Sequence, residues 1–457
     1  MNINQVNYYF SKLMMTYLSK LGVKYAFVSP GSRNTPISLA LSDQKVINTH
    51  NIIDERSSAY MALGSYKTNK YPAIIVTTSG TAVANLFPAV IESYMSKTPM
   101  IIITADRPKN LVGTGANQTI NQNHIFGSYV NKFFDADYYI NDFKKKSDIL
   151  LNENEDISDL NQLVLEAFKI AMGSNGGNKG PVHINIPFEK PLHLENREFI
   201  NSINSKDIKI LDNKINQSVK INYPVVKNIS KPIIICTDFS NSEIIKVSEK
   251  YNIPIFMECH GLRYGVKSNN IISSYEFICS YIDLKPDLII RFGRKPISNK
   301  LNELLENNKN ITHLFSKEKN INDDAKYILN ANIEDLSSHL KDSNFGIDIS
   351  WLNSIIDYQK IIRDYFDIFF KKTREHEGCI INKIVSQLPS NSNLLIGNSS
   401  PIRDLDKFSF NQEKHINIFS NRGVSGIDGV ISTAIGMSID KKYINSLIIG
   451  DISFYYD

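Results

Sequence analysis

The stretch AIIVTTSGTAVANLFPAVIESYMSKTPMIIITAD, residues 73–106, decides the fold class of this chain. It contains an apolar, β-rich run (73–80), a helical pattern (81–97) and a second apolar run (100–106). Continuous apolar runs are typical of strands in a parallel sheet that is covered on both faces. The stretch therefore predicts a strand–helix–strand unit of an α/β fold.

The same alternation extends outward from this stretch in three blocks. The first block covers 1–193, the second 194–345 and the third 346–457, and we interpret the Asn-, Lys- and Ser-rich stretch 195–230 as a linker. We expect an α/β protein of three doubly wound parallel-sheet domains. The third domain is expected to be incomplete, because the sequence stops before the later strand–helix units of such a sheet. Further strands are predicted at 25–29, 180–192, 232–239, 253–259, 287–293, 311–316, 393–400, 416–421 and 446–451, and a long amphipathic helix at 351–372.

Size and composition exclude several classes of protein. A chain of 457 residues with 42% hydrophobic and 21% charged residues is globular and long enough for about three domains. No apolar stretch approaches the roughly 20 residues that span a bilayer. A net charge of +4 is too small to indicate nucleic-acid binding. The four cysteines are scattered without a CxxC pair, which favours reduced thiols in a cytoplasmic protein.

Arginine is the rarer cation in this sequence, with 11 Arg against 40 Lys. An arginine in a loop therefore suggests a specific task, such as the planar, bidentate grip on a carboxylate or phosphate that lysine cannot provide. Four arginines fall in loops that follow predicted strands: Arg33, Arg107, Arg403 and Arg422.

Ligands of parallel α/β sheets bind at the carboxyl ends of the strands, so functional residues are expected there. In VSPGSRNTPISLAL (28–41), a tight turn is predicted to place Ser32 and Arg33 at an exposed mouth, although an ordinary capped turn explains the stretch equally well. In IIDERSSAYMALG (52–64), Glu55 lies in a first helical turn, where capping is the simplest role for an acidic residue.

Two further loops of the first block carry candidate ligands. TADRP (104–108) sets Arg107 at a strand end, and GTGANQTINQ (113–122) offers Asn117 and Gln118 as hydrogen-bond donors. The second loop is not a dinucleotide-binding fingerprint, because the third glycine is missing.

The third block repeats this arrangement of polar residues at strand ends. GNSSPIRDLD (397–406) places Ser399 at a strand end and Arg403 in the next helical turn. In SNRGVSGIDGVI (420–431), Arg422 precedes Gly423, Gly426 and Gly429, which suit either close approach of a diphosphate or helix packing. Asp451 ends a predicted strand and is placed to hold Mg²⁺ against a phosphate.

Eight stretches in this order resemble the 2-succinyl-5-enolpyruvyl-6-hydroxy-3-cyclohexene-1-carboxylate synthase family, thiamine-diphosphate carboligases of menaquinone or phylloquinone biosynthesis. They are SPGSRNTP, DERSSAYMALG, TTSGTAVANL, TADRP, GANQTINQ, GNSSPIRDLD, SNRGVSGIDG and GDISF. The resemblance implies a pyrimidine-binding first domain (1–193), a central domain without cofactor (194–345) and a diphosphate- and metal-binding third domain (346–457).

The resemblance also implies roles for single residues. Glu55 matches the glutamate that hydrogen-bonds the cofactor's aminopyrimidine ring, and Asp451 matches the aspartate that binds Mg²⁺ (or Mn²⁺). Ile427 matches the apolar wedge that bends the cofactor, and the diphosphate region is matched by Ser399, Gly423 and Gly426.

The family's substrates, 2-oxoglutarate and isochorismate, are both dicarboxylates and so require several fixed cations. The matching substrate-binding residues are Ser32, Arg33, Arg107, Asn117, Gln118, Arg403 and Arg422, with Arg294 and Lys295 as looser matches. Cofactor sites shared between subunits are further implied, in a homodimer or homotetramer.

The sequence departs from the family pattern at its end. The family's second metal ligand lies about one strand–helix unit beyond the aspartate, whereas this sequence ends at Asp457. We therefore expect a truncated form that binds the cofactor poorly and turns over little. The alternatives are another thiamine-diphosphate 2-oxo-acid carboligase, a non-catalytic α/β protein with a decayed cofactor site and, third, a nucleotide-dependent dehydrogenase.

Overall fold

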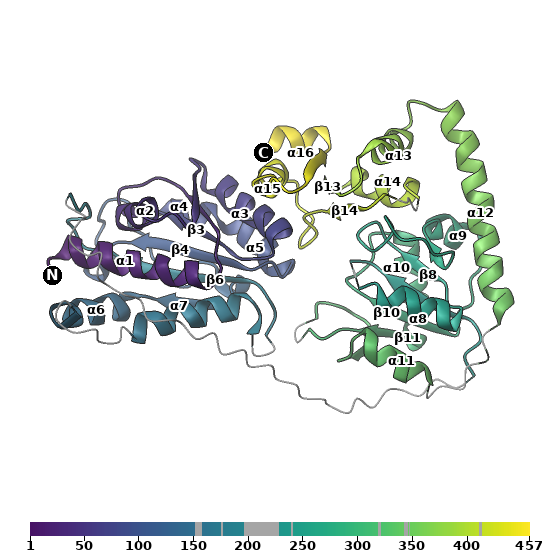
Figure 1. Ribbon diagram of the computed structural model, residues 1–457, viewed down its shortest axis with the longest axis horizontal. Helices are drawn as coiled ribbons and strands as arrows, with labels where there is room; N and C mark the ends of the chain where they lie inside the picture. The colour runs from purple at the N-terminus through teal and green to yellow at the C-terminus, as the bar shows by residue number, and fades with distance from the viewer. Residues whose placement is uncertain are drawn as a thin grey trace. The chain divides into compact units, whose positions relative to one another are not determined.

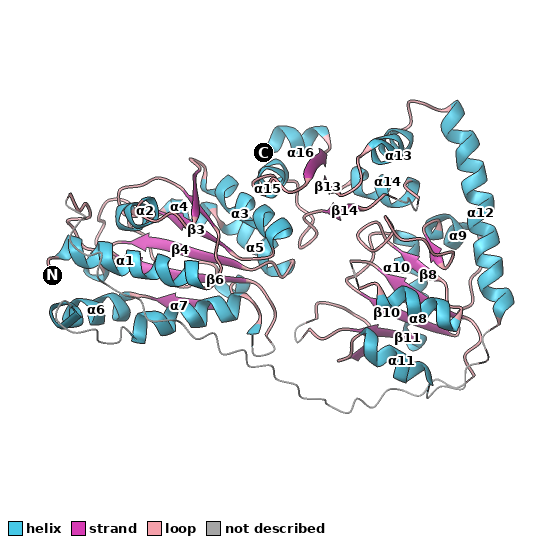
Figure 2. Cartoon of the chain, viewed as in Figure 1, coloured by secondary structure: helices cyan, strands magenta, loops and turns pink. Residues whose placement is uncertain are grey.

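The computed structural model describes all residues except 151–157, 175–176, 196–227, 239–240, 319–320, 342–345, 347 and 411–413. Three parallel sheets alternate with helices, which confirms the predicted α/β class (Figures 1 and 2). Most of the predicted linker lies outside the described residues. The described chain forms two compact units, one of Met1–Ile215, Asn421–Lys442 and Asp451–Asp457, the other of Asn216–Ser420 and Tyr443–Gly450.

The sheet of the first unit contains six parallel strands in the order β2-β1-β3-β4-β6-β5. The central strands are fully buried because helices cover both faces, which explains their continuous apolar runs. The strands are β1 (Tyr25–Val28), β2 (Asn48–Asn51), β3 (Ala73–Thr77), β4 (Met100–Asp106), β5 (Lys132–Asp135) and β6 (Pro181–Pro187).

Successive strand residues of this sheet point into two different hydrophobic cores. Ile74 and Val76 of β3 pack with helices of one face, and Ile75 packs with helices of the other. The first face carries α1 (Ile3–Lys20), α2 (Thr35–Ser42), α6 (Asp137–Leu150) and α7 (Ser158–Ala171). The second carries α3 (Glu55–Asn69), α4 (Thr81–Asn85) and α5 (Phe87–Met95).

Helix α3 also packs closely against α15 (Val430–Met437) through one glycine on each helix. A side chain at Gly64 would overlap the Thr433 carbonyl group, and one at Gly436 would overlap the Met61 carbonyl group. The two backbones therefore meet where only glycine fits. This contact joins the helix that begins at Glu55 to the glycine-rich segment that follows Arg422.

The second unit contains a six-stranded and a three-stranded parallel sheet, in the orders β12-β11-β10-β7-β8-β9 and β14-β13-β15. The larger sheet comprises β7 (Pro232–Cys236), β8 (Ile255–Met257), β9 (Ile271–Ile272), β10 (Leu288–Phe292), β11 (Thr312–Phe315) and β12 (Tyr327–Leu329). Its helices are α8 (Glu243–Tyr251) and α11 (Ile333–Lys341) on one face, and α9 (Tyr275–Tyr281), α10 (Asn299–Asn307) and α12 (Ile349–Lys372) on the other.

The smaller sheet contains β13 (Ser392–Ile396), β14 (Ile416–Phe419) and β15 (Ile444–Ile448), with α13 (Glu377–Gln387) and α14 (Ser400–Phe408). A buried ion pair ties α14 to the loop after β8: Arg263 Nη2 lies 3.2 Å from Asp406 Oδ1. The Asp406 carboxylate also accepts hydrogen bonds from the Cys259 backbone N–H, at 2.9 Å, and from the Tyr275 hydroxyl. The place of α14 is thus determined by residues of the loop after β8 and of α9.

No helix in the described part of the chain combines the length and the hydrophobicity that a bilayer span requires.

Candidate active site

Glu55 is the first residue of α3, next to the carboxyl end of β2. The preceding Asp54 caps the helix, because its carboxylate accepts a hydrogen bond from the Ser57 N–H at 2.8 Å. Capping is therefore done by Asp54, and Glu55 is left half-buried with Asn85 Nδ2 as a donor at 3.0 Å. Among the described residues, the Glu55 carboxylate meets a neutral amide and not a cation, which suits a group that receives a hydrogen bond from a ligand.

The structure corrects the predicted position of Arg33. Ser32 is exposed as expected, but Arg33 is buried, and its Nη1 donates a hydrogen bond to the Phe188 carbonyl group at 2.6 Å. The turn after β1 points the guanidinium inward to the end of β6, where it satisfies a carbonyl group that would be costly to leave buried without a donor. The Arg33 Nε has no hydrogen-bond partner among the described residues.

Arg107, Asn117 and Gln118 lie together at the ends of β3 and β4. Arg107 Nη2 donates to the Asn117 carbonyl group at 2.9 Å, which links the two predicted loops. Gln118 Nε2 donates to the Ser79 carbonyl group at 3.0 Å, and the Ser79 hydroxyl donates to the Gln118 carbonyl group at 3.1 Å. Arg107 also lines a cavity of about 540 Å³, together with Asp106, Lys109 and Asn185.

A buried polar network supports this cavity from within the sheet. Asp106 accepts from Asn185 Nδ2 at 2.8 Å, and burial raises the pKa of the Asp106 carboxyl group. Asn185 Oδ1 accepts from Gln122 and from the Thr104 hydroxyl, each at 2.7 Å. Since the single hydroxyl proton of Thr104 is used there, His183 must donate from Nε2 to Thr104.

His183 makes folding stability depend on pH. Burial lowers the pKa of His183 to about 3, so the imidazole is neutral in the folded protein at pH 5. The unfolded chain takes up a proton below about 6.5, so this contribution is present above pH 6.5 and is lost as the pH falls toward 3. We expect up to about 1.4 kcal/mol of lost stability per pH unit in that window.

Urea unfolding of wild type and His183→Gln at several pH values between 5 and 7 measures this effect. The glutamine variant is expected to be less stable at pH 7 but to show a shallower decline toward pH 5. His193→Gln changes an exposed histidine and should keep the wild-type slope. Equal slopes for wild type and His183→Gln would contradict the prediction.

The glycine-rich segment of the first unit is held by α3 and α5. A side chain on Gly423 would come within 2.6 Å of the Glu92 carbonyl oxygen, and one on Gly429 would overlap the Tyr60 ring. Gly423 and Gly429 thus meet protein atoms, which favours packing as the reason for these two glycines. Arg422, Gly426 and Ile427 of the same segment are half-buried.

Ser399 and Arg403 belong to the second unit. Strand β13 ends at Ile396, earlier than predicted, and Ser399 is the N-cap residue of α14 with φ 70° and no side-chain capping bond. A non-glycine residue in this conformation is strained, and such strain is concentrated at binding sites. Ser399 and Arg403 are both exposed at the start of α14.

Asp451 is exposed at the first position of α16 (Asp451–Tyr456), three residues after the end of β15. The prediction that a strand ends at Asp451 is therefore wrong, although the residue still follows a strand directly. Within the described residues, no group of three or more His, Cys, Asp or Glu side chains could hold a metal ion. Asp451 can supply one carboxylate to Mg²⁺ or Mn²⁺, since both ions favour oxygen ligands.

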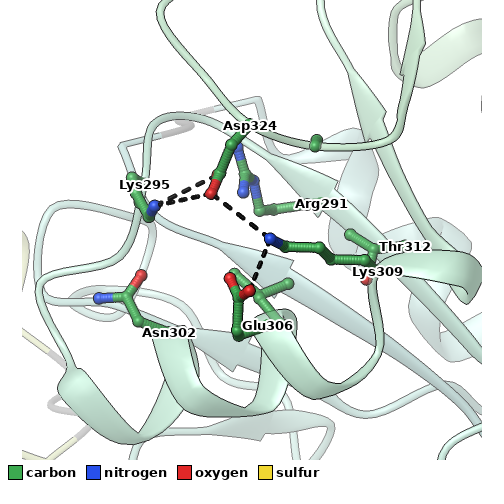
Figure 3. Close-up of a pocket in the computed structure, with 9 residues that line it drawn as sticks. Arg291, Lys295, Asn302, Glu306, Lys309, Thr312 and Asp324 are labelled. Carbon is green, nitrogen blue, oxygen red and sulfur yellow. Dashed lines mark hydrogen bonds and ion pairs between the residues drawn. The ribbon is translucent and has the colours of Figure 1, made fainter.

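Arg294 and Lys295 are engaged in ion pairs of the second unit. Arg294 Nε lies 2.9 Å from Asp238 Oδ2, and Lys295 Nζ lies 3.2 Å from Asp324. Figure 3 shows Asp324 between Lys295 and Lys309 in a pocket of about 20 Å³, which has room for roughly one water molecule. The cations of this pocket thus face carboxylates of the same unit.

Three residues that the sequence did not single out contact the candidate site. Asn85 donates to Glu55, Glu92 binds the backbone at Gly423, and the Tyr60 hydroxyl donates to Asp428. Only Glu92 leaves a signal in the sequence, as a single charge within the apolar helix FPAVIESYM. Asn85 is an ordinary exposed polar residue, and Tyr60 is a buried residue of the apolar core that a sequence pattern does not distinguish from its neighbours.

Comparison with known proteins shows the family to which the chain is similar. Residues 9–125 match the family model of the thiamine pyrophosphate enzyme N-terminal TPP binding domain. A 2-succinyl-5-enolpyruvyl-6-hydroxy-3-cyclohexene-1-carboxylate synthase of Staphylococcus aureus (strain MRSA252) is 33% identical over 461 residues, which cover 98% of this chain and 78% of the relative. The synthases of strains MSSA476 and MW2 are 32% identical with the same coverage.

The three α/β sheets and the matched first domain define a thiamine pyrophosphate enzyme. The similarity to its relatives extends over nearly the whole chain and is not confined to the cofactor motifs. The chain belongs to the 2-succinyl-5-enolpyruvyl-6-hydroxy-3-cyclohexene-1-carboxylate synthase family.

Proposed function

We propose that this chain is a thiamine-diphosphate-dependent transferase of menaquinone or phylloquinone biosynthesis. It decarboxylates 2-oxoglutarate and adds the remaining four-carbon unit to isochorismate, which gives 2-succinyl-5-enolpyruvyl-6-hydroxy-3-cyclohexene-1-carboxylate. The observation that carries this proposal is the 33% identity to a synthase of that name over 98% of the chain. The position of Glu55 at a strand end, free of the capping role, supports it.

Glu55 is the proposed catalytic residue. Its carboxylate is half-buried and accepts a hydrogen bond from the Asn85 amide, and it would accept another from the pyrimidine ring of thiamine diphosphate. When bound, the cofactor supplies the nucleophilic carbon and the electron sink that decarboxylation of a 2-oxo acid requires. Ile427 would pack against it, Ser399 and Gly426 would face its diphosphate, and Asp451 would hold Mg²⁺ or Mn²⁺.

The arginines and amides are proposed to bind the two dicarboxylate substrates. Arg403 is exposed, and Arg107 and Arg422 are half-buried. Arg33 is buried, and it would bind a substrate carboxylate through its Nε, which has no hydrogen-bond partner among the described residues. Ser32, Asn117 and Gln118 would add neutral hydrogen bonds, although the Gln118 amide already donates to Ser79. We further propose a cytoplasmic homodimer or homotetramer, in line with the family resemblance.

Release of labelled CO₂ from 2-oxoglutarate tests this function. The purified chain, supplied with thiamine diphosphate and Mg²⁺, should release CO₂ from the carboxyl group next to the keto group, and only when isochorismate is present. Release without isochorismate would indicate another 2-oxo-acid carboligase. Binding of neither thiamine diphosphate nor substrate would indicate a non-catalytic protein.

A further inference from the structure

Glu92 of α5 is a buried carboxylate that holds the backbone of the glycine-rich segment. Its side chain is 1% exposed. Oε1 accepts a hydrogen bond from the Gly423 N–H, and Oε2 accepts one from the Val424 N–H, each at 2.8 Å. A buried charge is costly unless it is well hydrogen-bonded, so both oxygens of this carboxylate contribute to holding the segment.

The shape of the segment is fitted to this carboxylate. A Cβ at position 423 would lie 2.6 Å from the Glu92 carbonyl oxygen and 2.9 Å from its Oε2. Both distances are shorter than a side-chain carbon tolerates, so Gly423 is required for the two hydrogen bonds to form. The contact joins residues 331 positions apart in the sequence.

The other end of the segment is held by Tyr60 of α3. The Tyr60 hydroxyl donates to Asp428, and Gly429 lies against the Tyr60 ring. Burial, followed by the Asp428 hydrogen bond, raises the pKa of Tyr60 well above its usual value, so the phenol stays protonated and remains a donor. Residues 422–429 are therefore fixed at both ends to the two helices.

We infer that Glu92 is a positioning residue that sets the direction of the adjacent Arg422 side chain for binding a substrate carboxylate. This inference rests on the proposed function, in which Arg422 contacts a dicarboxylate. A guanidinium binds a carboxylate through two parallel hydrogen bonds, so its direction matters as much as its charge. Loss of one Glu92 hydrogen bond would let the backbone next to Arg422 shift and would weaken that grip.

A double-mutant cycle between Glu92→Gln and Arg422→Ala tests the inference. Glutamine keeps the size of Glu92 but retains only one acceptor oxygen, so one of the two backbone hydrogen bonds is lost. We expect Glu92→Gln to raise the KM of one dicarboxylate substrate about tenfold, with a smaller change in kcat, since a hydrogen bond to a charged group is lost. In the Arg422→Ala background, Glu92→Gln should change that KM by less than about twofold, because the two residues act on one contact.

Glu166→Gln is the matched control, since Glu166 is about half-exposed and pairs with Lys132 on the surface. Additive effects of Glu92→Gln and Arg422→Ala on KM would overturn the inference. So would an Arg422→Ala variant with both substrate KM values unchanged. Absence of isochorismate-dependent CO₂ release by the wild type would instead be a failure of the proposed function.

Hydrogen exchange of the wild type gives a second measurement that needs no variant. Val424 is 48% exposed. If Glu92 holds this backbone, the N–H groups of Gly423 and Val424 exchange much more slowly than those of a free peptide. Exchange at the free-peptide rate would overturn the inference even if Glu92→Gln did not fold.

Discussion

Glu55→Gln lowers kcat by about 10²–10⁴-fold, the range expected when a group that assists proton transfer is removed. Glutamine keeps the size of the side chain and can still accept a hydrogen bond from Asn85, so the local packing is preserved. It lacks the negative charge that strengthens a hydrogen bond to the cofactor ring. The measurement is kcat for isochorismate-dependent CO₂ release at saturating thiamine diphosphate.

The fold should survive this substitution, because Asp54 and not Glu55 caps the helix. Removing a negative charge from the first helical turn costs only about 0.3–1 kcal/mol. Glu243→Gln is a matched control, since Glu243 is also the first residue of its helix and pairs with Lys246 on the surface. A Glu55→Gln variant with wild-type kcat, or a Glu243→Gln variant with a comparable loss, would contradict the assigned role.

Asp406→Ala is expected to destabilise the second unit by about 3–5 kcal/mol, as is typical when one partner of a buried ion pair is removed. The Arg263 side chain is 0% exposed, so alanine leaves its charge buried without the carboxylate. The Cys259 N–H and the Tyr275 hydroxyl also lose their acceptor. Urea unfolding measures the change in the free energy of unfolding.

Asp283→Ala is the control for this prediction, because both Asp283 and its partner Lys285 have side chains that are 80% exposed. It should change stability by less than about 0.5 kcal/mol. The milder substitution Asp406→Asn should also raise the KM of one substrate, because Asp406 holds α14 and the proposed substrate-binding residue Arg403 lies on the same helix. Equal stabilities of Asp406→Ala and Asp283→Ala would show that the buried pair does not hold α14.

Local patterns in the sequence were sufficient to predict the class of fold. Apolar runs such as 73–77 and 100–106 predicted parallel strands, because burial on both faces is a property of each strand's own residues. Strand ends were less well predicted: β13 and β15 end at Ile396 and Ile448 and not at 400 and 451. The predicted strands were too long because they included the short segments that follow each strand, which are extended in sequence pattern but are not paired in the sheet.

The partners of polar side chains were decided only by the tertiary structure. A turn of the type SPGSR is compatible with an exposed or a buried arginine. Arg33 turns inward because folding brings it next to the Phe188 carbonyl group, which is 155 residues away in the sequence. In the same way, Glu92 and Tyr60 decide that Gly423 and Gly429 serve packing. Periodicity and turn chemistry depend on neighbours in the sequence and can be read from it, whereas these contacts depend on residues that only folding brings together.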